Sequence, residues 1–399
     1  MNRNIKVVLL VSILFGFSIG LYDFALPFFL KEQGLSYTQM GYIFAISSVI
    51  MFVVRIYLGN LSDRLGRKLF YSIALAVSSI TNGLAPFAAK LLPAAALKSA
   101  REGANFTREV MHPVVLYELA PTRFLSSISI TRGLEFFFQG VGTLAAGLLL
   151  AISFKAAFGV SGALLAVAFV VFVTLFHEEK RPASTAPPIR LRDLLNFDVS
   201  PNLKLIGISS FILAFAMGIG HSYIMPLFFS VKFGANTDAV AVILMIHRFS
   251  FAVPMLFAGI IPRRHFKQVY IIGMILQGIF LTVSAVIPNL IAAAAVWLLH
   301  DLIGASFWVP VQNTIVQEFS RHDVRGSDVS KTLALGALGG IGGQLLAGDI
   351  AQTFSVSAAF LAGGVFTLIS VIPLFKLNLA ANGAGEHSAA KPVESAIEP

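Results

Sequence analysis

Residues 59–68 read GNLSDRLGRK, a short polar stretch between long apolar segments on either side. Arg64, Arg67 and Lys68 are costly to place in a bilayer, so this stretch belongs at a membrane surface. Gly59 and Gly66 permit close packing and a tight reversal of the chain. The stretch therefore predicts a turn between two helices that each cross a membrane.

The composition of the whole chain agrees with a membrane protein. Of its 399 residues, 56% are hydrophobic and only 12% are charged, and the mean hydropathy is +0.81. Soluble domains carry roughly 25% charged residues, so this chain has too few to cover a water-facing surface. It has no cysteine, which excludes disulfides and thiolate metal sites.

Segments of the length needed to span a bilayer recur along the chain. About 20 mostly apolar residues are required for one crossing. The first such segment is too long for the roughly 7–15-residue core of a signal peptide, so we expect it to be retained. Twelve windows qualify: 7–30, 38–59, 69–90, 93–119, 124–150, 155–177, 203–230, 237–260, 268–288, 290–318, 328–352 and 356–378.

The two halves of the chain resemble each other. A shift of 200 residues superposes five pairs of glycines, for example Gly34 on Gly234, which indicates an internal repeat. We therefore expect an all-α membrane protein in which twelve transmembrane helices form two pseudo-symmetric six-helix bundles around a central cavity. Its parts are an N-terminal half (1–177), a charged, proline-rich cytoplasmic linker (178–202), a C-terminal half (203–378) and a disordered cytoplasmic tail (379–399).

The basic residues predict the orientation. They are concentrated in the connections on one side, and the opposite loops carry Lys31, Lys90, Lys155 and Lys232. Loops rich in Lys and Arg stay in the cytoplasm, so we expect both termini inside a multi-pass plasma (cell inner) membrane protein. The net charge of +9 is then a topology signal, and no nucleic-acid partner is needed to explain it.

The stretch GNLSDRLGRK resembles the signature loop Gly-x-x-x-Asp-Arg-x-Gly-Arg-Lys of the major facilitator superfamily. The resemblance implies transport by alternating access, with helices 1, 4, 7 and 10 around the cavity. It also implies that the loop latches the two halves. The implied gating residues are Gly59, Asp63, Arg64, Gly66, Arg67 and Lys68. The second-half counterpart, GIIPRRHFK at 259–267, has Arg263 in place of the acid, so a topology anchor is enough to explain it.

Charged residues also occur within the spanning windows, where they usually mark a functional path. At 1.5 Å per residue, several on the four cavity helices fall at one depth. The predicted substrate and coupling residues are Asp23, Arg101, Arg108, His221, His300 and Asp301.

A second predicted layer lies between the fourth and fifth helices. It comprises Glu102, Asn105, Glu109, His112, Arg132 and Glu135. Contact with substrate and structural ion pairing between the two helices are both open for this layer. His247 and Arg248, outside the four cavity helices, are interpreted as structural. The glycine-rich runs 139–147 and 336–348 are interpreted as close helix packing, with a hinge as the alternative.

These features predict a secondary active transporter, not an enzyme. We expect its substrate to be a small polar solute that is anionic or zwitterionic, because guanidinium groups match carboxylates and phosphates. Proton coupling is expected where protonation of Asp23 competes with its attraction to Arg101. We expect a monomer among membrane lipids that needs no cofactor.

Two other functions stay open. One is an efflux antiporter in which Asp23, Glu135 and Asp301 bind drugs or lipophilic cations, although the glycine-proline pattern of drug antiporters is absent from 139–147. The other is a divalent-metal transporter using Asp23, His221, His300 and Asp301. A shared depth does not establish that these ligands converge, so no metal site is assigned. A non-transporting sensor or scaffold built on this fold is not favoured, because we expect no appended soluble domain through which it could signal.

Overall fold

The computed structural model describes residues 3–120, 123–178, 198–321 and 325–379. Within these ranges, the side chains of residues 55–65, 125, 325–327 and 330 are not described. The described chain is helical throughout and contains no strand. The N-terminal half consists of α1 (Arg3–Glu32), α2 (Tyr37–Leu65), α3 (Arg67–Leu84), α4 (Leu91–Leu119), α5 (Phe124–Leu150) and α6 (Phe154–Leu175).

The C-terminal half repeats this arrangement with two of its spanning segments broken. Its elements are α8 (Pro201–Gly220), α9 (Ile224–Phe233), α10 (Thr237–Met255), α11 (Phe266–Val286), α12 (Leu290–His300), η5 (Asp301–Ala305), α13 (Ser306–Phe319), α14 (Arg325–Thr353) and α15 (Val356–Ile369). A turn at residues 221–223 separates α8 from α9, and the π-helical turn η5 joins α12 to α13.

The predicted all-α membrane fold is confirmed. Pairing α8 with α9, and α12 with α13, gives the twelve expected spans. Among the described residues, eleven segments are long and apolar enough to cross a membrane. The remaining helix, α4, is as long as α2 at 29 residues, but it carries the charges singled out in the sequence.

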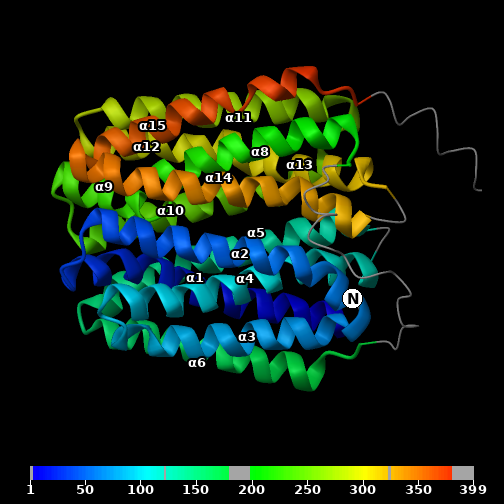
Figure 1. Ribbon diagram of the computed structural model, residues 1–399, viewed down its shortest axis with the longest axis horizontal. Coiled ribbons are helices and arrows are strands. Elements are labelled where there is room, and N and C mark those ends of the chain that lie inside the picture. The colour runs from blue at the N-terminus through cyan, green and yellow to red at the C-terminus, as the bar shows by residue number, and fades with distance from the viewer. Residues whose placement is uncertain (1–2, 121–122, 179–197, 322–324, 380–399) are drawn as a thin grey trace, which may run out of the picture.

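Figure 1 shows the helices side by side along the long axis, with α1–α6 on one side and α8–α15 on the other. The halves meet where α2 packs against α14 and where α5 packs against α10. The exact domain boundaries stay a prediction, because residues 179–197 of the linker and 380–399 of the tail lie outside the described residues.

Two glycines mark equivalent turns in the halves. Gly34 follows α1 with φ +78°, and Gly234 follows α9 with φ +66°. Both backbones are left-handed, a conformation that glycine adopts without steric cost. The 200-residue repeat therefore corresponds to a real structural equivalence. We call the end of the molecule with these turns the Gly34 end, and the end where α2 meets α3 the linker end.

The glycine-rich runs allow helices to pack closely. A Cβ atom built on Gly142 of α5 would lie 2.1 Å from the Phe17 carbonyl oxygen of α1, and one on Gly20 of α1 would lie 2.0 Å from the Gln139 carbonyl oxygen of α5. In the other half, one on Gly343 of α14 would lie 2.1 Å from the Phe215 carbonyl oxygen of α8. Because backbone atoms cannot move aside cheaply, only glycine fits at these two seams. This supports the packing interpretation of both runs.

The apolar core differs between the two ends. At the Gly34 end, one cluster includes side chains from both halves, such as Phe44 and Tyr223, whose ring centroids are 4.9 Å apart. Toward the linker end, the described residues form separate clusters, one around Tyr71 in the N-terminal half and one around Tyr270 in the C-terminal half. The halves are thus joined by a shared core at the Gly34 end.

Replacing Gly20 by alanine should destabilise the protein, because the added methyl group overlaps a backbone carbonyl of α5. We expect a loss of about 1–3 kcal/mol of unfolding free energy, as for other overpacked interiors, measured by thermal unfolding in detergent. The control is Gly159→Ala in α6, where nothing lies within 4 Å of the added atom and alanine favours the helix. Equal effects of the two substitutions would contradict the packing interpretation.

Candidate functional site: a polar cavity between the halves

A cavity of about 290 Å³ lies between the two halves. Its volume is near the lower limit of ligand pockets, which suits a small solute. The wall is formed by α1, α2, α4 and α5 from one half, and by residues 221–226, α10 and α14 from the other. Its polar side chains are Asp23, Ser47, Ser48, Lys98, Glu102, Gln139, Thr143, His221, Ser222, Arg248 and Gln344.

Arg101 lies behind this wall, where two carboxylates that line the cavity hold it. Its guanidinium is 2.9 Å from Asp23 Oδ1 and 2.7 Å from Glu102 Oε1, and it stacks on the Tyr22 ring at 3.7 Å. The Lys98 ammonium group contacts the same Glu102 oxygen at 2.9 Å. We call Asp23, Lys98, Arg101 and Glu102 the Arg101 cluster.

Polar groups on two further helices, α3 and α6, and a serine of α1 fix the position of Arg101. Its Nε donates to Asn82 Oδ1 of α3 at 3.0 Å. The Asn82 amide donates in turn to the Ser161 hydroxyl of α6 at 2.8 Å, and that hydroxyl lies 2.8 Å from the hydroxyl of Ser18. Arg101 is only 1% exposed, so this network supplies the polar partners that a buried guanidinium requires.

Arg108 is the second buried arginine of α4, and it is paired with α5. Its two Nη atoms contact the two carboxylate oxygens of Glu135 at 2.8 and 2.6 Å. Its Nε donates to the Tyr71 hydroxyl at 3.1 Å, and Ser12 accepts a further hydrogen bond at 3.1 Å. Removing one partner of a buried pair of this kind typically costs about 3–5 kcal/mol. Arg108 is fully buried and lies within the protein interior, away from the cavity wall.

The rest of the predicted second layer extends this network. Arg132 contacts both carboxylate oxygens of Glu109 at 2.7 Å. His112 lies 3.3 Å from the hydroxyls of Tyr71 and Thr131, and Asn105 accepts from Ser78 at 2.9 Å. Of the two interpretations left open, these contacts favour ion pairing between α4 and α5.

In the C-terminal half, His221, His300 and Asp301 occupy the two breaks in the spanning segments. His221 begins the turn after α8, and Asp301 begins the π-helical turn after His300. His247 of α10 joins them, with its Nε2 atom 2.7 Å from Asp301 Oδ2. His221 lines the cavity, whereas His247, His300 and Asp301 are buried behind it.

Arg248 is the remaining cation of the cavity wall, next to His247 on α10. Among the described side chains, none forms a hydrogen bond or a close ion pair with its guanidinium, although the charges of Asp23 and Asp301 attract it from a distance. By contrast, Lys98 and Arg101 are matched by Asp23 and Glu102. The wall and its directly paired residues thus hold three cations and two carboxylates, with the excess positive charge at Arg248.

The predicted gating loop is shorter in the structure than in the sequence analysis. Helix α2 continues through Leu65, so Gly59, Asp63 and Arg64 lie within a helix, and their side chains are outside the description. Gly66 makes the turn by itself, with φ +93°. The α3 helix that follows is held by Glu178, whose carboxylate accepts from the backbone N–H groups of Arg67 at 2.5 Å and Lys68 at 3.2 Å.

Other charges tie segments together at the linker end. Lys68 donates to the Phe176 carbonyl at 2.7 Å, and Arg67 forms an ion pair with Glu118 at 3.6 Å. In the other half, the Arg321 guanidinium contacts Asp328 at 2.8 Å. Its hydrogen bonds to Asp328 raise the pKa of Arg321 further above its already high value. These contacts lie within each half; those of the proposed latch, Asp63 and Arg64, fall outside the description.

Comparison with known proteins identifies the family. The family model described as Major Facilitator Superfamily matches residues 8–327. The chain belongs to the major facilitator superfamily. This confirms the resemblance noted at residues 59–68, and membership of the superfamily points to a transporter and not to an enzyme.

Solved structures of the superfamily share the whole fold. The human organic anion transporter MFSD10 (TETRAN) superposes with a TM-score of 0.73 at 19% identity, covering 93% of this chain and 99% of MFSD10. A D-xylose-proton symporter gives 0.72 at 16% identity, covering 94% and 97%. At such identities the likeness concerns the fold alone.

Among curated relatives in the superfamily, the quinolone resistance protein NorA of Staphylococcus aureus is 27% identical over 194 residues. The match covers 46% of this chain and 48% of NorA, so the chain spans about half the length of that relative.

Sequence reasoning missed several residues of this superfamily member's cavity. Arg248 and His247 were interpreted as structural because the resemblance places only helices 1, 4, 7 and 10 around the cavity. The available signal was the intramembrane charge of Arg248, which is costly unless it faces a partner or water. Lys98 and Gln139, which are not among the predicted site residues, also line the cavity.

Proposed function

We propose that this transporter moves a small organic anion, or a zwitterion with an anionic group, by alternating access. The observation that carries the proposal is the guanidinium of Arg248, which faces the cavity without a close ion-pair partner among the described residues. Guanidinium binds carboxylate and phosphate groups through paired hydrogen bonds. Arg101 and Arg108 do not support the proposal in the same way, because carboxylates of the protein already hold them.

The rest of the cavity suits such a solute. Gln139, Thr143 and Gln344 offer neutral hydrogen-bonding groups on both halves, so a solute bound to Arg248 can contact both. A ligand shared between the halves can stabilise one arrangement relative to another, which is what transport by alternating access requires. The shared core at the Gly34 end corresponds to the arrangement closed at that end. We assign the linker end and both termini to the cytoplasmic side of a plasma membrane, as the distribution of basic residues indicates.

We propose a proton on Asp23 as the coupling ion. Asp23 is the partner of Arg101 that is open to the cavity, with 44% of its side chain exposed. Its charged neighbours are Arg101, Glu102 and Lys98 of α4, with Arg248 across the cavity and Tyr22 beside it on α1. Protonation of Asp23 removes one of the two carboxylates that hold Arg101. The positive charge then available in the cavity increases, which favours binding of an anion together with the proton.

The likeness to NorA favours a second candidate, efflux of a drug or lipophilic cation. In that case Asp23 and Glu102 would bind the cation from the cavity wall. The two candidates make opposite demands on Arg248, since removing its charge weakens binding of an anion and strengthens binding of a cation.

Neutralising Arg248 tests the substrate class. We expect Arg248→Gln to reduce uptake of organic anions into proteoliposomes, because a charge-assisted hydrogen bond contributes about 1.5–3 kcal/mol, or roughly a ten- to hundredfold rise in KM. The assay uses a labelled panel of mono- and dicarboxylates, amino acids, phosphate esters and lipophilic cations. Arg264→Gln, which removes the same charge from an exposed arginine, is the matched control. Uptake of cations alone, undiminished in Arg248→Gln, would instead support the second candidate.

Asp23→Asn tests the coupling. The asparagine cannot release a proton but keeps the size of the side chain, so we expect accumulation driven by a pH gradient to disappear while exchange of labelled for unlabelled solute continues. Both rates are measured in the same proteoliposomes with and without an imposed gradient. The proposed role of Asp23 is excluded if the variant still accumulates solute in response to the gradient.

A further inference from the structure

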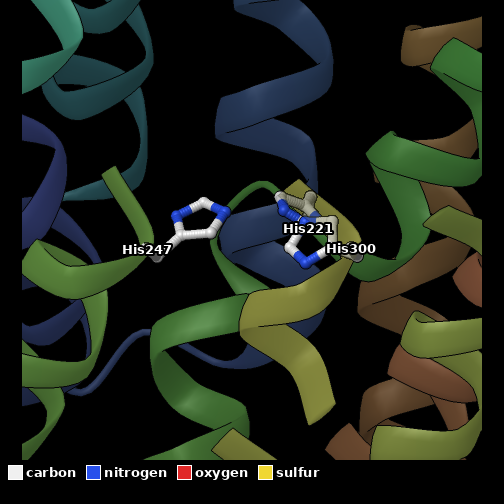
Figure 2. A group of neighbouring side chains, drawn as sticks. All are labelled: His221, His247 and His300. Carbon is white, nitrogen blue, oxygen red and sulfur yellow. The ribbon is translucent and has the colours of Figure 1, made fainter. Parts of the chain in front are cut away.

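Three imidazoles from separate helical segments converge at the two breaks of the C-terminal half. One nitrogen from each of His221, His247 and His300 lies within 4.8 Å of the other two. Figure 2 shows the three rings side by side, with His247 approaching His221 and His300 from α10. We call these three residues the histidine cluster. Its members are up to 79 residues apart in the sequence, so only the fold brings them together.

Neighbouring groups orient two of the rings. His300 Nδ1 lies within hydrogen-bonding distance of the Trp297 carbonyl oxygen, so this nitrogen carries the hydrogen and Nε2 keeps its lone pair. Asp301 lies beside both rings, with its Oδ2 2.7 Å from His247 Nε2 and its Oδ1 3.2 Å from His300 Nε2. Metal-binding histidines are commonly held as His300 is, with one nitrogen bonded to a backbone carbonyl and the other directed at the ion.

The imidazole of His247 gives the second observation that points to a ligand. The residue is 2% exposed, and neither of its ring nitrogens forms a hydrogen bond among the described residues. The Trp297 ring stacks against His247 with a centroid distance of 4.2 Å, which restricts the imidazole to its position. A buried polar atom without a partner is costly, and an ion bound to its lone pair removes that cost.

We propose that the histidine cluster binds a divalent transition-metal ion, with Zn²⁺ as its representative. Neutral imidazoles suit zinc, copper and nickel, whereas magnesium and calcium prefer oxygen ligands. Asp301 contacts both His247 and His300, so its carboxylate adds negative charge beside the bound cation. Tetrahedral zinc with bonds of 2.0–2.1 Å sets neighbouring nitrogens about 3.4 Å apart, so small side-chain rotations close the site around the ion.

The position of the site gives it an entry path and a consequence. His221 lines the cavity and is only partly buried, so an ion can reach the cluster from there. The fourth coordination position remains for water or a solute anion. Because Arg248 directly follows His247 in α10, a bound ion adds positive charge on the same side of the cavity.

Metal binding by the purified full-length chain tests the proposal. The affinity tag is removed, the protein is stripped with chelator, and Zn²⁺ binding is measured by isothermal titration in detergent. We expect one ion per chain and a rise in the thermal unfolding temperature. Co²⁺ should give the visible absorption of a tetrahedral site. His221→Gln, in the partly exposed turn, should weaken binding at least roughly tenfold, as should His247→Gln and His300→Gln.

Two histidines outside the cluster serve as controls. His177→Gln changes an exposed residue near the linker end, and His112→Gln changes a buried one that contacts Tyr71 and Thr131. Both should bind Zn²⁺ like the unmodified protein. Size-exclusion profiles identify any variant that has lost its fold. If the buried variants His247→Gln and His300→Gln lose their fold, His221→Gln still tests the proposal. Absence of stoichiometric binding, or binding that all three cluster variants retain, would overturn the proposal. None of these measurements depends on transport.

Discussion

The cost of placing charge in a membrane protein's interior is the constraint on which the rest of this structure depends. Arg101 and Arg108 are buried near the centre of α4, and neither could remain there without a carboxylate and further hydrogen bonds. Glu135 supplies this for Arg108 from α5, and Asp23 supplies it for Arg101 from α1. The close packing of α4 is against α2 and α3, and these ion pairs connect it in addition to α1 and α5. The charges that make α4 the least apolar span thus link it to helices that it does not pack against closely.

The two halves use polar residues differently, although they repeat one arrangement of helices. In the N-terminal half, α1 and α4 are continuous helices, and their charges are largely paired within the half. In the C-terminal half, the corresponding spans are interrupted at residues 221–223 and 301–305. π-helical turns and broken membrane helices are common at functional sites. The breaks, together with Arg248, which has no close ion-pair partner among the described residues, give the C-terminal half the groups that are available to a ligand.

Much of the fold follows from the sequence because hydropathy and length determine where a membrane helix can be. The twelve windows, the turn at Gly66 and the equivalence of Gly34 with Gly234 were all predictable in this way. The pairing of α4 with α5 was also foreseeable, since Arg132, Glu135 and Gln139 share one face of a helix. Which carboxylate holds which arginine was not, because that depends on side-chain distances that spacing does not encode.

The cavity was harder to predict than the fold. Apolar windows do not reveal the helix breaks that bring His221 and His300 to His247, since the interrupted segments are as hydrophobic as continuous ones. Depth along the membrane places Asp23, Arg101 and Asp301 in one layer, but in the structure Asp23 and Arg101 belong to the Arg101 cluster and Asp301 contacts the histidine cluster. Spacing along a helix gives only the depth of a residue in the membrane, whereas a binding site requires side chains to converge in three dimensions.

Chemical modification of arginines tests the central claim most directly, namely that the arginines of α4 are committed to carboxylates while Arg248 is available to a solute. Purified protein is treated with phenylglyoxal, which reacts with accessible guanidinium groups, and each arginine is followed by peptide mass spectrometry. Arg263, with 53% of its side chain exposed, reports that the reagent is active. We expect Arg248 to react and Arg101 and Arg108 to remain unmodified. Modification of Arg101 or Arg108 as fast as Arg248, or an unreactive Arg248, would contradict the account.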